Sequence, residues 1–161
     1  VDFAHTPNSL RELLLSVRNI TNGRIIVVFG SAGLRDVSKR SWMGSVAAEL
    51  ADITVITAED PRTESVAAIM AEIAAGCAKM GGVEAETFWQ LTDRAEAIRF
   101  AVGLADPGDI VLACGKAHEQ SMCFGVVEFP WDDRVAMCAA VADRMGEVVP
   151  APPLLPTANS N

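Results

Sequence analysis

The order of hydrophobic and polar positions predicts helices and strands that alternate along the chain. Apolar residues first recur at the spacing of one helix face, at Leu10, Leu13, Leu14 and Val17. We expect Thr6 and Pro7 to begin this helix and Asn22-Gly23 to end it. The run at 25–29 is entirely apolar and mostly β-branched, which is typical of a strand buried on both faces of a parallel sheet.

The same alternation continues to about residue 145. Apolar stripes predict helices at 43–50, at 66–73, at 98–105 with Thr92 or Asp93 as its cap, and on Val135, Cys138, Ala139 and Ala142. Strands are predicted at 53–56 and 110–113, with a weak strand at 84–88, an edge strand at 121–129 and a loop at 76–83. Single helices between strands indicate an α/β fold, Rossmann-like, with a mostly parallel sheet and helices on both faces. We assign residues 1–146 to one domain and 147–161 to a proline-rich tail, extended or disordered.

The composition narrows the classes of function. The chain has 161 residues, of which 13 are Lys or Arg and 21 are Asp or Glu, so its formal charge is −8. Binding nucleic acid through its phosphates, or docking on an anionic membrane, requires a basic face, so we expect neither partner. No apolar run is long enough for membrane insertion, and no secretory signal precedes the first helix. We therefore expect a cytoplasmic protein.

The four cysteines, at 77, 114, 123 and 138, are not spaced as a metal site. None forms a C-x-x-C pair, and neither His5 nor His118 lies near such a pair. Each cysteine stands in an apolar segment, which favours reduced thiols in the core of a cytosolic protein. The sequence therefore predicts no metal ligands.

Parallel sheets bind ligands at the carboxyl ends of their strands, which directs attention to three segments. The first, 30–40, carries glycines that would let backbone amides approach an anion, and Arg35, Lys39 and Arg40 would favour one. It matches neither the GxGxxG nor the Walker A pattern, so the alternative is a simple turn with a solvated surface.

The other two segments carry mixed charges. In Glu59-Asp60-Pro61-Arg62, carboxylates would receive an ammonium and the guanidinium a carboxylate, so the segment can hold a zwitterion. The alternative is a group of acids at the start of a helix. In Gly115-Lys116-Ala117-His118-Glu119, the histidine would be a base, a ligand contact or a surface residue. No Ser-His-Asp or Cys-His arrangement accompanies it.

Together these segments resemble the C-terminal domain of the Mur ligases, specifically the MurE type. Asp2-Phe3-Ala4-His5-Thr6-Pro7 is similar to D-Y-A-H-T-P, Gly33-Leu34-Arg35-Asp36 to G-D-R-D, and Lys39-Arg40 to the K-R that follows. Glu59 to Arg62 is similar to D-N-P-R, Gly115 to Glu119 to G-K-G-H-E, and Asp132-Asp133-Arg134 to D-D-R. The ordered motifs run from residue 2 to about 145, nearly the whole chain.

The resemblance implies the last domain of an ATP-dependent amide-forming ligase of peptidoglycan synthesis. Such an enzyme adds a diamino acid to UDP-N-acetylmuramoyl-L-alanyl-D-glutamate. ATP and Mg²⁺ would be bound mainly by a central ATPase domain of the same chain, so the isolated domain is expected to be inactive. The partners are therefore the UDP-muramoyl dipeptide, the diamino acid and that central domain.

The resemblance also assigns roles to single residues. Arg35 would contact the amino acid and act catalytically, beside the developing negative charge. The remaining residues expected to bind the amino acid are Glu59, Asp60, Pro61, Arg62, Gly115 and Glu119. Asp2 and His5 would lie at the hinge next to the nucleotide and bind the cofactor.

The chain departs from the family pattern where selectivity is expected. Glu59 and Asp60 replace Asp and Asn, Leu34 replaces an acidic residue, and Ala117 replaces glycine. An ionised Asp60 cannot donate a hydrogen bond to a second carboxylate, so lysine or ornithine is expected in preference to meso-diaminopimelate. Two alternatives stay open, a non-catalytic α/β module that binds a small ligand and a C-terminal domain of a folylpolyglutamate or cyanophycin type of ligase.

Overall fold

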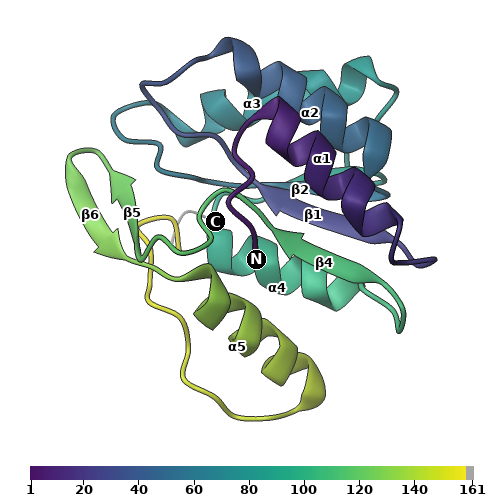
Figure 1. Cartoon of the computed structure of the whole chain (residues 1–161). Coiled ribbons are helices and arrows are strands. Elements are labelled where there is room, and N and C mark those ends of the chain that lie inside the picture. Colours follow the sequence, from purple (N-terminus) through teal and green to yellow (C-terminus); the bar gives the residue numbers. More distant parts are fainter. Residues whose placement is uncertain (159–161) are drawn as a thin grey trace.

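The computed structural model describes residues 1–158, in which helices alternate with the strands of a parallel sheet (Figure 1). The helices are α1 (Pro7–Arg18), α2 (Ser38–Leu50), α3 (Val66–Lys79), α4 (Arg94–Leu104) and α5 (Asp133–Met145). The strands are β1 (Ile25–Phe29), β2 (Ile53–Ile56), β3 (Phe88–Gln90), β4 (Ile110–Ala113), β5 (Ser121–Phe124) and β6 (Val127–Pro130). The predicted α/β class is confirmed.

The main sheet has the strand order β3-β2-β1-β4, with every neighbouring pair parallel. From β1 the chain moves outward to β2 and β3, and it then crosses back to place β4 on the other side of β1. This reversal makes the carboxyl ends of β1 and β4 a topological switch point, where parallel sheets form their binding crevices.

Helices cover both faces of the sheet, as predicted. In Figure 1, α1, α2 and α3 lie on one side of the strands, and α4 and α5 lie on the other. Each face has its own hydrophobic cluster, because alternate residues of β1 point to opposite sides: Val27 packs towards α1–α3 and Val28 towards α4 and α5. All five residues of β1 are fully buried. None of the helices within residues 1–158 is long and apolar enough to cross a membrane.

Side-chain caps set the helix starts. Thr6 caps α1 as predicted, in a reciprocal arrangement with Ser9. Asp93, not Thr92, caps α4, and Asp132 caps α5. Two acidic caps therefore fix where α4 and α5 begin, and both begin with a charged residue that is completely buried.

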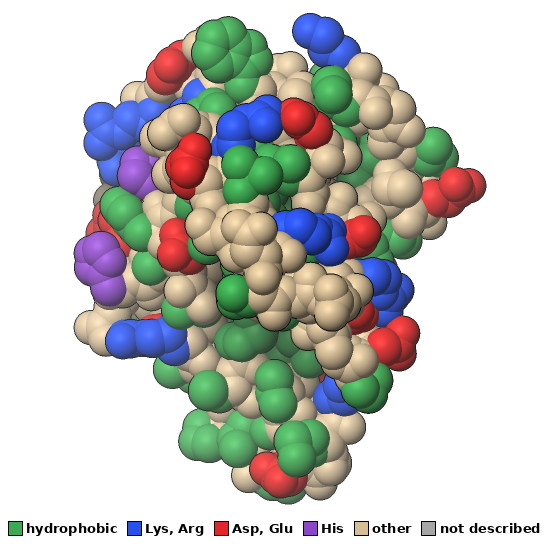
Figure 2. Space-filling view, turned by 45° about the vertical axis from the view of Figure 1, so that its right-hand side comes forward, with side chains coloured by type: hydrophobic (Ala, Val, Ile, Leu, Met, Phe, Trp, Pro, Cys, Tyr) green, Lys and Arg blue, Asp and Glu red, His purple; other side chains and the backbone are tan. Residues whose placement is uncertain are grey.

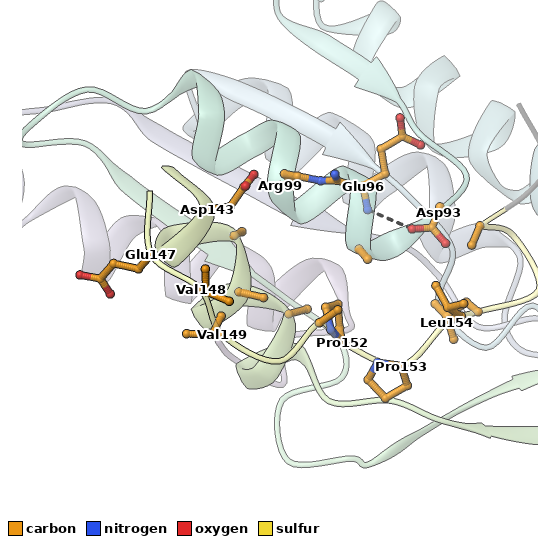
Figure 3. Close-up of a pocket in the computed structure, with 17 residues that line it drawn as sticks. Asp93, Glu96, Arg99, Asp143, Glu147, Val148, Val149, Pro152, Pro153 and Leu154 are labelled. Atoms are coloured by element: carbon orange, nitrogen blue, oxygen red, sulfur yellow. Dashed lines mark hydrogen bonds between the residues drawn. The ribbon is translucent and has the colours of Figure 1, made fainter. Parts of the chain in front are cut away.

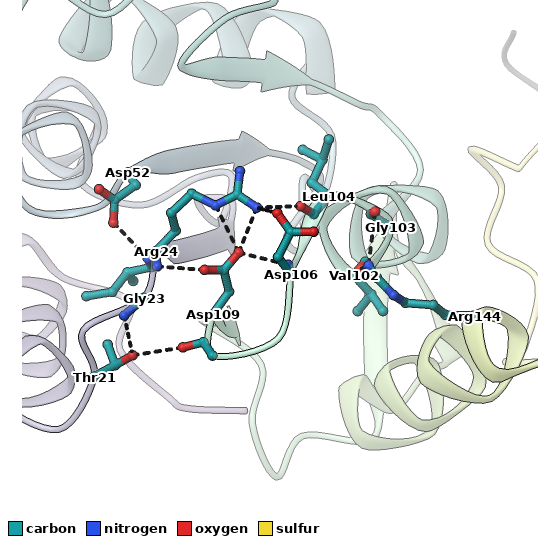
Figure 4. A network of polar contacts seen from close by, with 12 residues as sticks. Thr21, Gly23, Arg24, Asp52, Val102, Gly103, Leu104, Asp106, Asp109 and Arg144 are labelled. Atoms are coloured by element: carbon teal, nitrogen blue, oxygen red, sulfur yellow. Dashed lines mark hydrogen bonds and ion pairs between the residues drawn. The ribbon is translucent and has the colours of Figure 1, made fainter.

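A polar network fastens the amino end of the sheet (Figure 4). The guanidinium of Arg24, just before β1, contacts Asp106 at 2.8 Å and Asp109 at 2.7 Å, and it donates to the carbonyl of Leu104. The Asp109 carboxylate also accepts from the backbone amide of Arg24 at 2.7 Å. The start of β1 is thereby joined to the turn before β4, at the end of the sheet away from the predicted site.

Several predicted boundaries were wrong. The first helix ends at Arg18, before Asn22-Gly23, and α3 continues to Lys79 where a loop was expected at 76–83. Gly76, where the predicted loop begins, lies inside α3 and serves close packing: a Cβ there would lie 2.0 Å from the carbonyl oxygen of Ser41 in α2. The weak strand lies at Phe88–Gln90 instead of 84–88, since residues 83–87 form a turn. Residues 121–129 are not an edge strand of the main sheet but form the separate antiparallel hairpin β5–β6.

Helix α5 buries Ala142 of the predicted stripe but neither Val135 nor Cys138. Its buried residues are Asp133, Ala136, Ala140 and Ala142, whereas Val135 is 41% exposed and Cys138 is exposed. Small alanine side chains of α5 pack in the cluster that it shares with α4, whereas Val135 and Cys138 point outward. The thiols of Cys77, Cys114 and Cys123 are free and buried as expected, but the core assignment of Cys138 was wrong.

The predicted tail contains no helix or strand over residues 147–158, yet part of it packs on the domain. Leu155 belongs to the hydrophobic cluster of α4 and α5, and the hydroxyl of Thr157 donates to Asp93 at 2.9 Å. Residues 159–161 of the predicted tail lie outside the described part of the chain.

Candidate functional site

The three predicted segments meet at the carboxyl edge of the sheet. Residues 30–36 follow β1, 57–62 follow β2, and 114–119 follow β4, and all three strands run in the same direction. The amide of Gly33 donates to the carbonyl of Asp60 at 2.9 Å, which joins the first segment to the second. The amide of Leu34 donates to the Glu64 carboxylate, which also pairs with Arg40 at 2.9 Å. We call these segments loop 1 (30–36), loop 2 (57–62) and loop 3 (114–119).

Glu59 is the buried acid at the centre of this edge. It is 5% exposed, and its Oε2 atom is buried without a hydrogen-bond partner among the described residues. Burial raises the pKa of Glu59, and the positive charge of Arg94 opposes this shift. Gly115 of loop 3 leaves the space for the carboxylate, because a Cβ on Gly115 would lie 2.1 Å from Oε2. Gly115 has φ +104°, a conformation that favours glycine.

Asp60 is held by other groups of the same chain. Its Oδ2 atom accepts from the Lys116 ammonium at 2.7 Å, and its Oδ1 atom accepts from the amide of Cys123 at 2.8 Å. Lys116 is 2% exposed and also contacts the Glu119 carboxylate at 2.8 Å. Burial alone would lower the pKa of Lys116, but its hydrogen bonds to the two carboxylates raise it above the usual value. The Lys116 ammonium therefore links Asp60 of loop 2 to Glu119 of loop 3, two of the acids predicted to bind the amino acid.

Arg62 joins loop 2 to the β5–β6 hairpin, which lies beside this edge in Figure 1. Its amide donates to the carbonyl of Cys123 at 3.1 Å, and its carbonyl accepts from the amide of Gly125 at 2.7 Å. The Nε atom of Arg62 is buried and has no partner within the described chain. Pro61, between Asp60 and Arg62, is buried. The hairpin thus supports the loop from which the guanidinium projects.

The first residues of the chain run alongside loop 3. The amide of Asp2 donates to the carbonyl of Ala113 at 2.9 Å, and the amide of Gly115 donates to the carbonyl of Asp2 at 3.0 Å. The Phe3 ring lies 4.6 Å from the ring of His5 and 5.1 Å from that of His118, measured between centroids. Lys39 of α2 donates to the carbonyl of His5 at 2.8 Å. The structure therefore brings Asp2 and His5 to the same edge as the three loops.

Left-handed backbone is concentrated here. Within residues 1–158, five non-glycine residues have positive φ, namely Leu34, Asp60, Arg62, Ala85 and Ala117. Four of the five belong to the three loops, and such conformations cluster where the surrounding structure enforces a functional geometry. Ala117 has φ +40°, which gives a physical reason for glycine at that position in the family pattern.

Arg35 is the predicted residue least anchored by the structure. It is exposed at the surface of loop 1, and within residues 1–158 no hydrogen bond or ion pair engages its side chain. Its guanidinium is available to a ligand, but it is not fixed against Glu59 or Arg62.

The sequence analysis did not identify the buried support of the site. Arg94 pairs with Asp133, and both residues are completely buried beneath loops 2 and 3. The sequence contained a signal for the burial of Arg94, because this residue lies on the inward stripe of α4, four positions before the buried Ile98. An arginine on a core-facing stripe requires an acidic partner, and Asp133 lies in the D-D-R motif already noted.

Other features of the surface are separate from this edge. No group of three or more His, Cys, Asp or Glu side chains in residues 1–158 is placed to hold a metal ion. A cavity of about 590 Å³ lies between α4, α5 and the tail, and none of its lining residues belongs to the three loops (Figure 3). On the face of the molecule drawn in Figure 2, basic and acidic side chains are interspersed, and hydrophobic side chains gather at its lower end.

Comparisons with known proteins agree with the fold and the motifs. A family model described as "Mur ligase, glutamate ligase domain" matches residues 1–117. The UDP-N-acetylmuramyl-tripeptide synthetase of Roseiflexus sp. (strain RS-1) is 48% identical over 143 residues, which cover 89% of this chain and 28% of the relative. The UDP-N-acetylmuramoyl-L-alanyl-D-glutamate--2,6-diaminopimelate ligase of Agrobacterium fabrum (strain C58) is 42% identical over 149 residues, 92% of this chain and 29% of the relative.

Solved structures extend the similarity. A UDP-N-acetylmuramoyl-L-alanyl-D-glutamate--2,6-diaminopimelate ligase superposes with a TM-score of 0.79 and 31% identity, over 91% of this chain and 29% of that one. Escherichia coli FolC in complex with ADP superposes with a TM-score of 0.50 and 19% identity, over 70% of this chain and 24% of that one, a likeness of fold alone. The chain thus spans less than a third of the length of these relatives.

Proposed function

The chain belongs to the Mur ligase family, and we propose from this premise that it is the amino-acid-binding domain of a MurE-type ligase. The complete enzyme would add a diamino acid to UDP-N-acetylmuramoyl-L-alanyl-D-glutamate in peptidoglycan synthesis, in the cytoplasm. The names of the two relatives described above support this assignment. The relatives extend well beyond the matched region, so the UDP-sugar site and most of the ATP site are assigned to preceding domains.

One observation carries the proposal: loop 2 places buried side-chain atoms of opposite charge, without partners in the described chain, at the carboxyl edge of the sheet. The Oε2 atom of Glu59 and the Nε atom of Arg62 are both buried and unpartnered within the described chain. A free amino acid carries an ammonium and a carboxylate, and these are the groups that a carboxylate and a guanidinium bind. Arg35, exposed on loop 1, is the second candidate for a carboxylate or for a developing negative charge.

In the proposed reaction, ATP supplies the phosphoryl group that activates the substrate carboxylate, with Mg²⁺ neutralising phosphate charge. The contribution of this chain is to bind and orient the attacking amine. Glu59 would hold the amino acid by an ammonium group, Arg62 would hold its carboxylate, and Gly115 would allow close approach. Asp2 and His5, beside loop 3, would contact the nucleotide from this domain. Transfer of the terminal phosphoryl group to the carboxylate would release ADP, and attack of the amine on the acyl phosphate would form the amide bond and release phosphate, with the amine proton passing to solvent.

The choice of amino acid is the finer part of the proposal. We expect lysine or ornithine in preference to meso-diaminopimelate, because Asp60 cannot donate to a second carboxylate as an asparagine does. In the structure, both carboxylate oxygens of Asp60 already accept hydrogen bonds, one from Lys116 and one from the Cys123 amide. A side-chain ammonium would therefore share Asp60 with Lys116 or bind to Glu119.

Phosphate release by the full-length protein tests the proposal. The coding sequence upstream of Val1 should contain a P-loop roughly 200 residues earlier, as a Mur ligase requires. With ATP and the UDP-muramoyl dipeptide, phosphate release should depend on an added diamino acid, and the 161-residue chain alone should release none. Lysine, ornithine and meso-diaminopimelate are compared in parallel, with Asp60→Asn as the selectivity variant. If no amino acid stimulates phosphate release, the proposed function is wrong; if meso-diaminopimelate is the best substrate with Asp60 present, only the selectivity is wrong.

A further inference from the structure

A buried ion pair lies directly beneath the two loops of the proposed amino-acid site. Arg94 and Asp133 are both 0% exposed, and the guanidinium meets the carboxylate twice, through Nε at 2.7 Å and through Nη2 at 2.7 Å. The indole of Trp131 donates a third hydrogen bond to Asp133 at 2.8 Å. Although burial alone would lower the pKa of Arg94, the Asp133 carboxylate raises it, so the pair is ionised.

The remaining donors of Arg94 bind the main chain of the two loops. Nη1 donates to the carbonyl of Ala58 at 3.2 Å, and Nη2 donates to the carbonyl of Cys114 at 2.7 Å. Ala58 directly precedes Glu59, and Cys114 directly precedes Gly115. A guanidinium is planar and its donors have fixed directions, so it holds these two carbonyls at a fixed separation. No main-chain hydrogen bond of the sheet performs this task, because β2 and β4 are not neighbours but lie on either side of β1.

The two partners are themselves fixed at helix starts. Arg94 is the first residue of α4, after the cap Asp93, and Asp133 is the first residue of α5, after the cap Asp132. The geometry points to the Arg94–Asp133 pair as the positioning device of the amino-acid site, which sets the spacing between loops 2 and 3. That the two loops bind an amino acid rests on the proposed function, but the spacing between the loops can be measured whether or not that function is correct.

The spacing matters because Glu59 and Gly115 fit each other closely. The carboxylate of Glu59 occupies the space in which a Cβ on Gly115 would lie, at 2.1 Å from Oε2. A shift of about 1 Å between the loops would change where that carboxylate presents its free oxygen, and misplacement of this size can cost about 100-fold in rate. Stability alone does not explain the pair, since buried ion pairs can generally be replaced by apolar side chains without loss of stability.

The double variant Arg94→Met/Asp133→Leu in the full-length protein separates positioning from packing. It replaces both charges with apolar side chains, of which Met is close to Arg in volume and Leu is larger than Asp, so circular dichroism first establishes that the variant is folded. We expect amide hydrogen exchange to rise at least about tenfold in peptides covering 57–62 and 114–119, with β1 unchanged. We also expect kcat/KM for the amino acid to fall about 10- to 100-fold, with the KM for ATP unchanged. A folded double variant with parental exchange and parental kcat/KM would overturn the inference.

Two control variants test whether the effects on hydrogen exchange and on kcat/KM are specific to the Arg94–Asp133 pair. Trp131→Phe removes one hydrogen bond to Asp133 but leaves both loop carbonyls bound, so exchange in the loops should stay parental. Arg24→Met disturbs a similar network at the opposite end of the same sheet, so it should not alter kcat/KM for the amino acid. Loss of amino-acid kcat/KM in Arg24→Met as large as in the double variant would refute a specific role for Arg94.

If the double variant does not fold, Arg94→Lys tests the inference instead. The lysine keeps a positive charge beside Asp133, but a single ammonium cannot bind both carbonyls as the planar guanidinium does. Its loops should again exchange faster, and parental exchange would refute the inference. If the unmodified protein shows no phosphate release that depends on an amino acid, the proposed function fails, and hydrogen exchange alone decides whether the pair sets the loop spacing.

Discussion

Substituting alanine for Gly115 is the sharpest test of how loops 2 and 3 fit together. Two penalties should add at this position. Gly115 has φ +104°, and its missing side chain leaves room for the Glu59 carboxylate, which a Cβ would approach to 2.1 Å. Because Glu59 is only 5% exposed, its carboxylate cannot simply swing into solvent. The alanine must therefore strain the backbone and also displace a packed charged group.

The chain provides a matched control in Gly108. Its φ is +100°, and nothing lies within 4 Å of the position a Cβ would take. Gly108→Ala should therefore cost only the backbone strain, about 1–3 kcal/mol of unfolding free energy. Gly115→Ala should cost about 1–3 kcal/mol more, the usual penalty for overpacking. For a domain of this size, the extra cost corresponds to a further drop in melting temperature of about 2–12 °C.

Thermal and urea unfolding of both variants measure this difference, and a third variant assigns it. When Gly115→Ala is made in a Glu59→Ala background, the extra cost should disappear, because the carboxylate is no longer present. The reasoning is refuted if Gly115→Ala and Gly108→Ala are equally destabilised. It is also refuted if the extra cost persists without the Glu59 carboxylate.

Three further predictions concern the stability and the accessibility of the fold as a whole. Arg24 lowers the pKa of Asp109 to about 2. The stability that this pairing contributes is therefore present above the ordinary carboxyl pKa of about 3.9 and is lost as the pH falls towards 2. Asp109→Asn should flatten the acid limb of the plot of melting temperature against pH. In native protein, iodoacetamide followed by mass spectrometry should label Cys138, while Cys77 and Cys114, whose pKa values burial raises to about 12, stay unlabelled. Leu155→Ala should cost about 2 kcal/mol or more in urea unfolding, and no loss would mean that the tail does not pack on α4 and α5.

The sequence was sufficient for the layered fold because its strongest signals are local. The run at 25–29 has no polar interruption, and the stripe beginning at Leu10 has the period of a helix, so the strand forms where it was predicted and the helix begins where it was predicted, although it ends earlier. The wrong assignments came from contacts between distant segments. A loop was predicted to begin at Gly76 because the contact of this residue with α2 is not visible in the sequence, and Val135 was predicted to be core because the sequence does not show that the alanines of α5 face α4. Local patterns do not contain those contacts.

For the candidate site, too, the local features could be predicted and the contacts between distant residues could not. The positions of loops 1 to 3 followed from the rule that binding residues lie at the carboxyl ends of parallel strands. How their charges pair could not be inferred, because Lys116 and Arg94 are separated from their partners Asp60 and Asp133 by 56 and 39 residues. The sequence therefore suggested that Asp60 is open to a ligand, whereas in the structure Lys116 and the Cys123 amide bind it. Glu59, treated in the sequence as one of three similar acids, is the one left with a free buried oxygen.

Buried polar atoms without a hydrogen-bond partner gather in loops 1 and 2 in a way that folding alone does not explain. Within residues 1–158, the buried side-chain atoms without a hydrogen-bond partner are Ser31 Oγ, Arg40 Nε, Glu59 Oε2 and Arg62 Nε. Three of these four belong to loops 1 and 2, and each buried unpaired group costs about 1–3 kcal/mol. Left-handed backbone at Asp60 and Arg62 adds to that cost. Selection for stability would remove such features, whereas a bound ligand that supplies the missing partners would recover the cost, which supports the proposed amino-acid site.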